Sequence, residues 1–266
     1  MEQLINWKGA ICKYTKSGKG KTIFLLHGFV EEGSLWTSTA KWLTENYCVI
    51  VPDLPGFGNS ALPARHKNWQ ISDYADYVLA IADKEKVASF RVFGHSMGGY
   101  TALAIAKKAP EKIISLGLIN SHCFADTAEK KANRKKGNEF IAQYGSLPFV
   151  KEILPNLFTP AFLSKNATLI KKLVEQAGNY SPEGLMAANS AMANRPDNSE
   201  VLGQLKVPIL LVSGKTDEAV PLSISLQQVP LGKVVDFHLF KRTKHVAMLE
   251  EPKLFKQIML YFLSIY

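Results

Sequence analysis

The sequence predicts an α/β fold with a mostly parallel sheet, helices on both faces and a helical insert. Short, fully apolar runs alternate with helix-length segments up to residue 121, and this alternation returns after residue 205. Between residues 122 and 205 no convincing buried strand is found. Strands that are apolar along their whole length must be covered on both faces, which is typical of parallel sheets linked by helices. We therefore expect one core made of residues 1–121 and 206–266, and an insert made of residues 122–205.

The core elements follow from hydrophobic periodicity and from the residues that interrupt it. Residues 71–86 place apolar side chains at helical spacing, which predicts a helix with one buried face. Ser34 is expected to cap a helix over residues 34–46, and Pro110 is expected to end the helix that follows Gly98. An edge strand or hairpin arm is expected over residues 8–16, a final helix over 252–262, and buried strands over 22–26, 48–52, 90–93, 114–119, 208–212 and 234–240.

The insert is expected to be entirely helical. Ser181-Pro182-Glu183 is a strong start signal, because it combines an N-cap residue, a proline at the first helical position and an early acid. Helices are expected near residues 127–142, 146–154, 166–178 and 182–194.

The charge of the chain does not indicate a nucleic-acid partner. The net charge is +9 over 266 residues, and basic residues exceed acidic ones in all three segments: 14 to 10, 10 to 8 and 8 to 5. The densest basic cluster, Lys130 to Lys136, has no interleaved aromatic residues and is expected to be a solvated helix face.

Cysteine usage and apolar runs bear on the compartment. Cys12, Cys48 and Cys123 are widely spaced and form neither a metal-ligand spacing nor a disulfide framework. No N-terminal signal pattern and no apolar run long enough to span a bilayer is found in the sequence. We expect a cytoplasmic monomer or homodimer without a membrane partner.

Ser96 is the strongest functional signal in the chain. It lies in Gly94-His95-Ser96-Met97-Gly98, directly after the apolar run Phe90-Arg91-Val92-Phe93 and before a predicted helix. A strand, a sharp turn and a helix are the context in which G-x-S-x-G presents a nucleophilic serine. Gly94 and Gly98 lack the Cβ atoms that would collide with neighbouring backbone in so tight a turn.

A serine nucleophile needs a base to take its proton, and the base needs a carboxylate to orient it. Of the six histidines, His245 follows the last predicted strand. Asp217 follows the strand before it, in Ser213-Gly214-Lys215-Thr216-Asp217. The carboxyl ends of parallel strands meet at one edge of a sheet, so Ser96, Asp217 and His245 are expected to form a catalytic triad.

Two backbone amides are expected to bind the oxyanion of the reaction intermediate. One is the N–H of Met97, the residue after the nucleophile. The other is the N–H of Phe29, in the turn His27-Gly28-Phe29 after the strand 22–26. His27 and His95 are expected to play structural roles rather than act as a second base.

These motifs resemble the α/β-hydrolase superfamily over about residues 20–266. The resemblance includes Asp53-Leu54-Pro55-Gly56-Phe57-Gly58-Asn59-Ser60, where Asp53 is expected to be architectural. It implies an eight-stranded sheet, and it is greatest to lid-bearing, esterase-like serine hydrolases, which include C–C bond hydrolases, thioesterases and methylesterases. No metal and no organic cofactor are then expected.

At several motif positions this chain differs from particular branches of the superfamily, which disfavours the reactions of those branches. Ser96 stands where epoxide hydrolases and dehalogenases have aspartate. Aromatic C–C hydrolases usually carry Gly-Pro-Gly soon after His-Gly and Asn before the serine, whereas this chain has Phe29-Val30-Glu31-Glu32-Gly33 and His95. A similar pyruvate-eliminating enzyme of menaquinone synthesis binds its multiply charged acid through arginines, and this chain has four arginines: Arg65, Arg91, Arg134 and Arg195.

The sequence thus favours hydrolysis of a small carboxylic ester or thioester through an acyl-enzyme. A C–C hydrolase or lyase of the same fold, and a hydrolase-fold ligand receptor with slow turnover, remain alternatives. The insert is expected to act as a lid that sets substrate choice, with Phe124, Phe158 and Met192 in contact with an uncharged acyl group.

Overall fold

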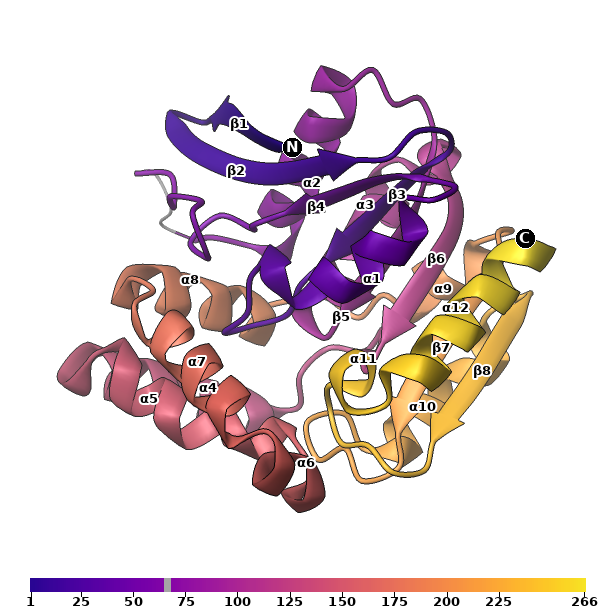
Figure 1. Cartoon of the computed structure of the whole chain (residues 1–266). Coiled ribbons are helices and arrows are strands. Elements are labelled where there is room, and N and C mark those ends of the chain that lie inside the picture. The colour runs from indigo at the N-terminus through magenta and orange to yellow at the C-terminus, as the bar shows by residue number, and fades with distance from the viewer. Residues whose placement is uncertain (65–67) are drawn as a thin grey trace.

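The computed structural model describes residues 1–64 and 68–266 and contains an eight-stranded sheet (Figure 1). The strand order is β1-β2-β4-β3-β5-β6-β7-β8. β1 and β2 form an antiparallel hairpin that joins β4, and from β4 to β8 every neighbouring pair is parallel. The strands are β1 (Glu2–Trp7), β2 (Ala10–Ser17), β3 (Thr22–Leu26), β4 (Cys48–Pro52), β5 (Phe90–His95), β6 (Ile113–Ile119), β7 (Ile209–Gly214) and β8 (Val235–Phe240). The mostly parallel, eight-stranded sheet is confirmed.

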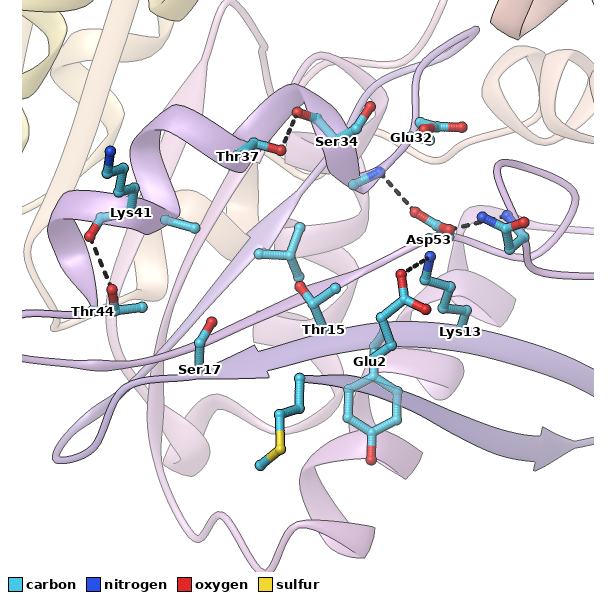
Figure 2. A pocket seen from close by; sticks show the side chains of 16 residues that line it. Glu2, Lys13, Thr15, Ser17, Glu32, Ser34, Thr37, Lys41, Thr44 and Asp53 are labelled. Carbon is cyan, nitrogen blue, oxygen red and sulfur yellow. Dashed lines mark hydrogen bonds and ion pairs between the residues drawn. The ribbon is translucent and has the colours of Figure 1, made fainter.

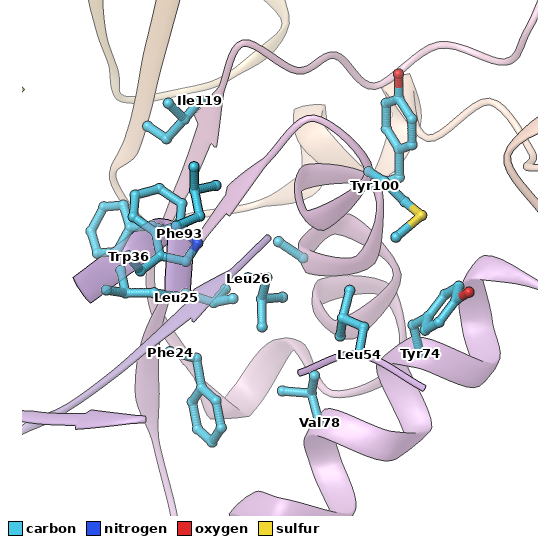
Figure 3. Packing of buried hydrophobic residues seen from close by; sticks show 14 of the residues in the cluster. Phe24, Leu25, Leu26, Trp36, Leu54, Tyr74, Val78, Phe93, Tyr100 and Ile119 are labelled. Carbon is cyan, nitrogen blue, oxygen red and sulfur yellow. The ribbon is translucent and has the colours of Figure 1, made fainter. Parts of the chain in front are cut away.

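Helices cover both faces of this sheet. In Figure 1, α1 and α12 lie on the near side of the sheet, and α2 and α3 lie behind it. The core helices are α1 (Thr37–Leu43), α2 (Ile71–Lys84), α3 (Met97–Lys108), α10 (Leu222–Gln228), α11 (Ala247–Glu250) and α12 (Pro252–Ile265). The central strand β3 is buried along its whole length. Its Phe24 lies on the side of Val78, whereas Leu25 lies on the side of Trp36 and Phe93 (Figure 3). This two-sided burial is why the strand is apolar at every position.

The insert consists of helices that lie beyond the carboxyl ends of the parallel strands (Figure 1). They are α4 (Ala128–Tyr144), α5 (Ser146–Ile153), α6 (Pro160–Lys165), α7 (Ala167–Gly178) and α8 (Pro182–Ala193), followed by α9 (Ser199–Gln204). The Ser181 hydroxyl accepts a hydrogen bond from the Gly184 N–H and caps α8 as predicted.

Hydrogen bonds tie the insert to the core at several points. The His245 N–H donates to the Leu157 carbonyl over 2.9 Å. Glu250 accepts from both the backbone and the hydroxyl of Thr159, at 2.9 and 2.6 Å. Tyr180 Oη donates to Glu32 over 3.1 Å. The insert is therefore bonded directly to the loop that carries His245.

Several details of the sequence prediction need correction. The strand β1 was not expected, and α6, α9 and α10 were also missed. Ser34 is not an N-cap: it lies inside a 3-10 turn, Gly33–Trp36, that precedes α1, and the residue before that turn makes no side-chain cap. In the described residues, no helix is long and apolar enough to cross a membrane.

Candidate active site

Ser96 occupies a sharp turn between β5 and α3. Its φ of 50° is in the left-handed region, which is uncommon for a residue with a side chain. The turn is possible because the adjoining glycines allow close backbone contact. A Cβ on Gly94 would lie 2.1 Å from the Gly98 carbonyl oxygen, and one on Gly98 would lie 2.4 Å from the Leu26 carbonyl oxygen. Ser96 itself is partly exposed while its neighbours are buried, so the turn presents this side chain.

His245 and Asp217 form a buried pair after the last two strands. His245 Nδ1 donates to Asp217 Oδ2 over 2.8 Å. The same oxygen accepts from Asn120 Nδ2 at 3.0 Å, and Asp217 Oδ1 accepts from the backbone N–H groups of Ala219 and Val220 at 2.9 Å each. Burial alone would raise the pKa of Asp217, but His245 and these donors together hold it below its usual value. The carboxylate is therefore ionised and fixes the ring of His245.

The amides of Phe29 and Met97 are available for an anion. Met97 begins α3, so its N–H is one of the donors that a helix start leaves without an internal partner. Within the part of the chain that the structure describes, neither N–H donates to another residue. Helix starts also favour negative charge. This is the arrangement expected of an oxyanion site.

Ser96 and His245 line one pocket of about 130 Å³. Phe29 and Met192 also line it. Arg134 and Tyr100 add polar side chains to the lining of this pocket. Phe158 lies elsewhere, in a neighbouring apolar cavity of about 30 Å³ that shares Val30, Glu31 and Leu157 with the Ser96 pocket.

Phe124, expected to contact substrate, is not among the described residues that line either cavity. Its ring stacks on His122 at a centroid distance of 6.0 Å, and its carbonyl accepts from Arg195 Nε at 3.1 Å. Phe124 therefore packs the base of the insert. Arg65 and His66, counted among the arginines and histidines of the sequence, lie outside the described residues.

A second histidine–carboxylate pair lies beside the first. His95 Nδ1 is 2.8 Å from Glu31 Oε2, and His95 Nε2 is 2.8 Å from the carbonyl oxygen of His245. The Gly28 N–H also donates to Glu31 Oε2, over 2.6 Å. Burial alone would lower the pKa of His95, but the Glu31 charge and hydrogen bond raise it. Burial alone would raise the pKa of Glu31, but the charge of His95 and its hydrogen bond hold that pKa below its usual value.

Both ring nitrogens of His95 therefore carry protons. A carbonyl oxygen only accepts, so Nε2 must donate to it, and an ionised Glu31 requires Nδ1 to donate as well. Sequence reasoning treated His95 as a packed neighbour and missed its partner Glu31. The missing signal is spatial, because 64 residues separate the two in the chain.

His27 is structural, as expected. Its Nδ1 donates to the Gly28 carbonyl at 2.8 Å, and its Nε2 accepts from the Leu54 N–H at 2.9 Å. Burial lowers its pKa, which agrees with a neutral ring that accepts at one nitrogen. His27 has no nitrogen left for proton transfer.

Asp53 is architectural as well. It accepts from the N–H groups of Gly33 and Asn59, at 2.8 and 3.0 Å (Figure 2). These bonds border a polar pocket of about 450 Å³ that Glu2, Lys13 and Lys41 also line. Neither Ser96 nor His245 lines this larger pocket. The smaller pocket at the ends of the strands is therefore the candidate active site.

Comparison with known proteins agrees with the fold. The family described as alpha/beta hydrolase fold matches residues 21–252. The chain belongs to this α/β-hydrolase family. A solved structure of a thermophilic esterase from Thermogutta terrifontis, with malate bound, superposes with a TM-score of 0.91 at 25% identity and covers 99% of this chain and 98% of its own.

Curated relatives of this α/β hydrolase differ in the bond they cleave. Lipase 1 of Psychrobacter immobilis is 27% identical over 89% of this chain and 75% of its own length. The 2-hydroxy-6-oxo-6-(2'-aminophenyl)hexa-2,4-dienoic acid hydrolase of Metapseudomonas resinovorans is 25% identical over 99% of this chain and 91% of its own. Family membership thus leaves the substrate open.

Proposed function

We propose that this protein is a serine hydrolase of small carboxylic esters or thioesters. The observation that carries the proposal is that Ser96, on a left-handed turn, and His245, held by Asp217, line the same pocket. A base oriented by a carboxylate and a serine on a strained turn together form the arrangement used for nucleophilic acyl transfer. The esterase and lipase relatives support the same reading.

In the proposed mechanism, Ser96 Oγ attacks the acyl carbon while His245 Nε2 takes the hydroxyl proton. The Phe29 and Met97 amides hold the oxyanion of the tetrahedral intermediate. His245 then gives its proton to the departing alkoxide or thiolate, and an acyl-enzyme remains. Water, deprotonated by His245, attacks the acyl carbon. The bond to Ser96 Oγ then breaks, His245 returns the proton to Oγ, and the acid is released. Asp217 stays ionised throughout and stabilises the imidazolium form of His245.

The insert is proposed to be the lid over this chemistry. Met192 and Arg134 come from it and line the Ser96 pocket, and Phe158 lines the adjoining cavity. A cytoplasmic location and a monomeric or dimeric state remain part of the proposal. They rest on the sequence alone.

The proposal is tested with a substrate panel and one substitution. The panel contains p-nitrophenyl acetate, an acyl-thioester, a lactone and a vinylogous diketone. We expect turnover of the ester or thioester, and a loss of about 10⁶-fold in kcat for Ser96→Ala. A fluorophosphonate probe should label the parent protein and a Ser38→Ala control, which alters an exposed serine, but not Ser96→Ala.

Other outcomes would redirect or refute the assignment. Cleavage of the diketone without ester turnover would show a C–C hydrolase. A single slow turnover followed by retained product would show a receptor. Equal labelling of Ser96→Ala would remove Ser96 from the mechanism.

A further inference from the structure

One wall of the Ser96 pocket carries an excess of positive charge. Asp126 is buried and pairs with two arginines: its Oδ2 accepts from Arg134 Nε at 2.5 Å, and its Oδ1 lies 2.7 Å from Arg195 Nη1. Lys130, on the same helix as Arg134, donates from Nζ to the Ala219 carbonyl at 3.0 Å. One carboxylate thus pairs with two guanidinium groups. Such an excess, partly removed from water, is stabilised when a further anion approaches.

The two arginines are not equivalent. Arg195 is 3% exposed, and its groups are committed to the carbonyls of Phe124 and Met192, to Asp126 and to the face of Tyr100, whose ring lies 3.9 Å from the guanidinium carbon. It therefore serves the packing of the insert and does not line the pocket.

Arg134 lines the pocket, and its Nη2 group is available to a ligand. Its side chain is 22% exposed. Its Nε binds Asp126, and its Nη1 donates to Asn189 Oδ1 at 3.1 Å. Among the described residues, none accepts a hydrogen bond from its Nη2. The guanidinium is therefore held at Nε by Asp126 and at Nη1 by Asn189, and the Nη2 group remains for a ligand.

The other charges in the pocket do not offset Arg134. Of the described residues that line the pocket, Glu31 is the one acid, and it is already bound to His95. His122, behind Tyr100, is neutral, because burial and the charge of Arg195 lower its pKa to about 3. Asp217 is paired with His245. The pocket thus presents a net cation to whatever enters it.

We propose that the Ser96 pocket is selective for acyl groups that carry a carboxylate, and that Arg134 binds this carboxylate. The inference rests on the proposed hydrolase function and names its substrate class: half-esters or half-thioesters of short dicarboxylic acids. It revises the expectation of an uncharged acyl group. The unused Nη2 group of Arg134 can donate a charge-assisted hydrogen bond to a carboxylate oxygen, which is stronger than a bond between neutral groups.

The test compares isosteric substrates that differ in charge alone. Monomethyl glutarate and methyl 5-methylhexanoate have the same acyl shape, but the first ends in a carboxylate and the second in an isopropyl group. Methanol release gives kcat/KM for each. We expect the parent protein to prefer monomethyl glutarate, and Arg134→Gln to lower this preference by about 10- to 100-fold. Arg134→Lys should retain part of it.

Lys135→Gln is the matched control. It removes one positive charge from the exposed face of the same helix and should leave the preference unchanged. If Lys135→Gln and Arg134→Gln lower the preference equally, the effect is that of net charge and the proposed subsite is wrong. A parent protein that prefers the neutral ester would also overturn it.

A binding measurement separates this proposal from the hydrolase proposal. In the Ser96→Ala background, calorimetry should detect glutarate, weaker 5-methylhexanoate binding, and loss of the difference with Arg134→Gln. This result would support the anion subsite even if no ester were turned over. Equal affinity for the two acids would refute the subsite while leaving the hydrolase assignment intact.

Discussion

Two histidine–carboxylate pairs lie side by side in the site, and they differ in what their second ring nitrogen does. The rings of His245 and His95 are 4.9 Å apart. His245 is bound at Nδ1 by Asp217, and its ring borders the pocket. His95 is bound at both nitrogens, by Glu31 and by the His245 carbonyl. Burial next to a carboxylate therefore does not make a histidine a base, because a base also needs an uncommitted nitrogen.

The largest expected effect distinguishes the two histidines directly. His245→Ala removes the proton acceptor and should lower kcat for ester hydrolysis by about 10⁶-fold. His95→Gln keeps a side chain that can donate to the His245 carbonyl and should lower kcat by about 10- to 100-fold. Both rates are measured with p-nitrophenyl acetate on protein whose folding is checked by circular dichroism. If a folded His95→Gln protein were as inactive as His245→Ala, the proposed difference in role between the two histidines would be wrong.

Substitution of the two carboxylates should follow the same order: the change at Asp217 should lower kcat more than the change at Glu31. Both effects should be smaller than that of His245→Ala. Asp217→Asn disturbs the tautomer of His245 and should lower kcat by about 10⁴-fold. Glu31→Gln leaves that tautomer intact and should lower kcat by about 10-fold, through a less firmly held Gly28 turn. Its main effect should be on stability, because it leaves the buried charge of His95 without its counterion, at a cost of about 3 kcal/mol. Initial rates and urea unfolding of the two variants check this order.

The smallest effect concerns the pH dependence of stability. The folded pKa of His95 is raised above 6.5, so the stability that its charge contributes is complete below that pH and is lost as pH rises through the folded value. The folded pKa of Glu31 is lowered below 4.5, so its contribution is present above that pH and is lost as pH falls through the folded value.

The pair should therefore stabilise the fold most between about pH 4.5 and 6.5. We expect the difference in unfolding free energy between the parent and a Glu31→Gln/His95→Gln variant to shrink above this window. Unfolding in urea from pH 5 to 9 measures it. The exposed pair Lys171–Glu175, neutralised in the same way, serves as the control and should show little change. A constant difference across this range would mean that His95 does not carry the proton.

The sequence predicts best those features that depend on residues adjacent in the chain. Ser96 has a glycine-flanked turn, and the buried strands have continuous apolar runs. These features are readable because each depends on neighbours in the chain. β1 escaped prediction because Glu2–Trp7 is an edge strand with exposed alternate residues and no apolar run. Phe124 shows that an aromatic residue in an insert packs against its neighbours as readily as it lines a pocket: its ring stacks on His122.

Glu31 and Arg134 were missed for a related reason. Each acquires its role from residues far along the chain: His95 for the first, Asn189 and the pocket for the second. A charged residue in a loop and one in a basic helix give no sign of which partners will surround them. The sequence predicts that the basic cluster Lys130 to Lys136 is a solvated helix face, and the side chains of Lys131, Lys135 and Lys136 are indeed exposed. Helical geometry turns Arg134, among these exposed neighbours, inward.

The adjacent residues Glu31 and Glu32 reach in opposite directions. Glu31 binds His95 and the Gly28 N–H in the core, whereas Glu32 binds Tyr180 and Gln176 of the insert. Val30, directly before this pair, is a β-branched residue whose φ is 58°, in the left-handed region. This short segment therefore joins the contacts of Glu32 with the insert to the turn that carries the Phe29 amide. Any displacement of the insert that keeps the Glu32 bonds would pull on the backbone two residues from Val30 and three from Phe29. We therefore expect access to the pocket and alignment of the Phe29 amide to change together.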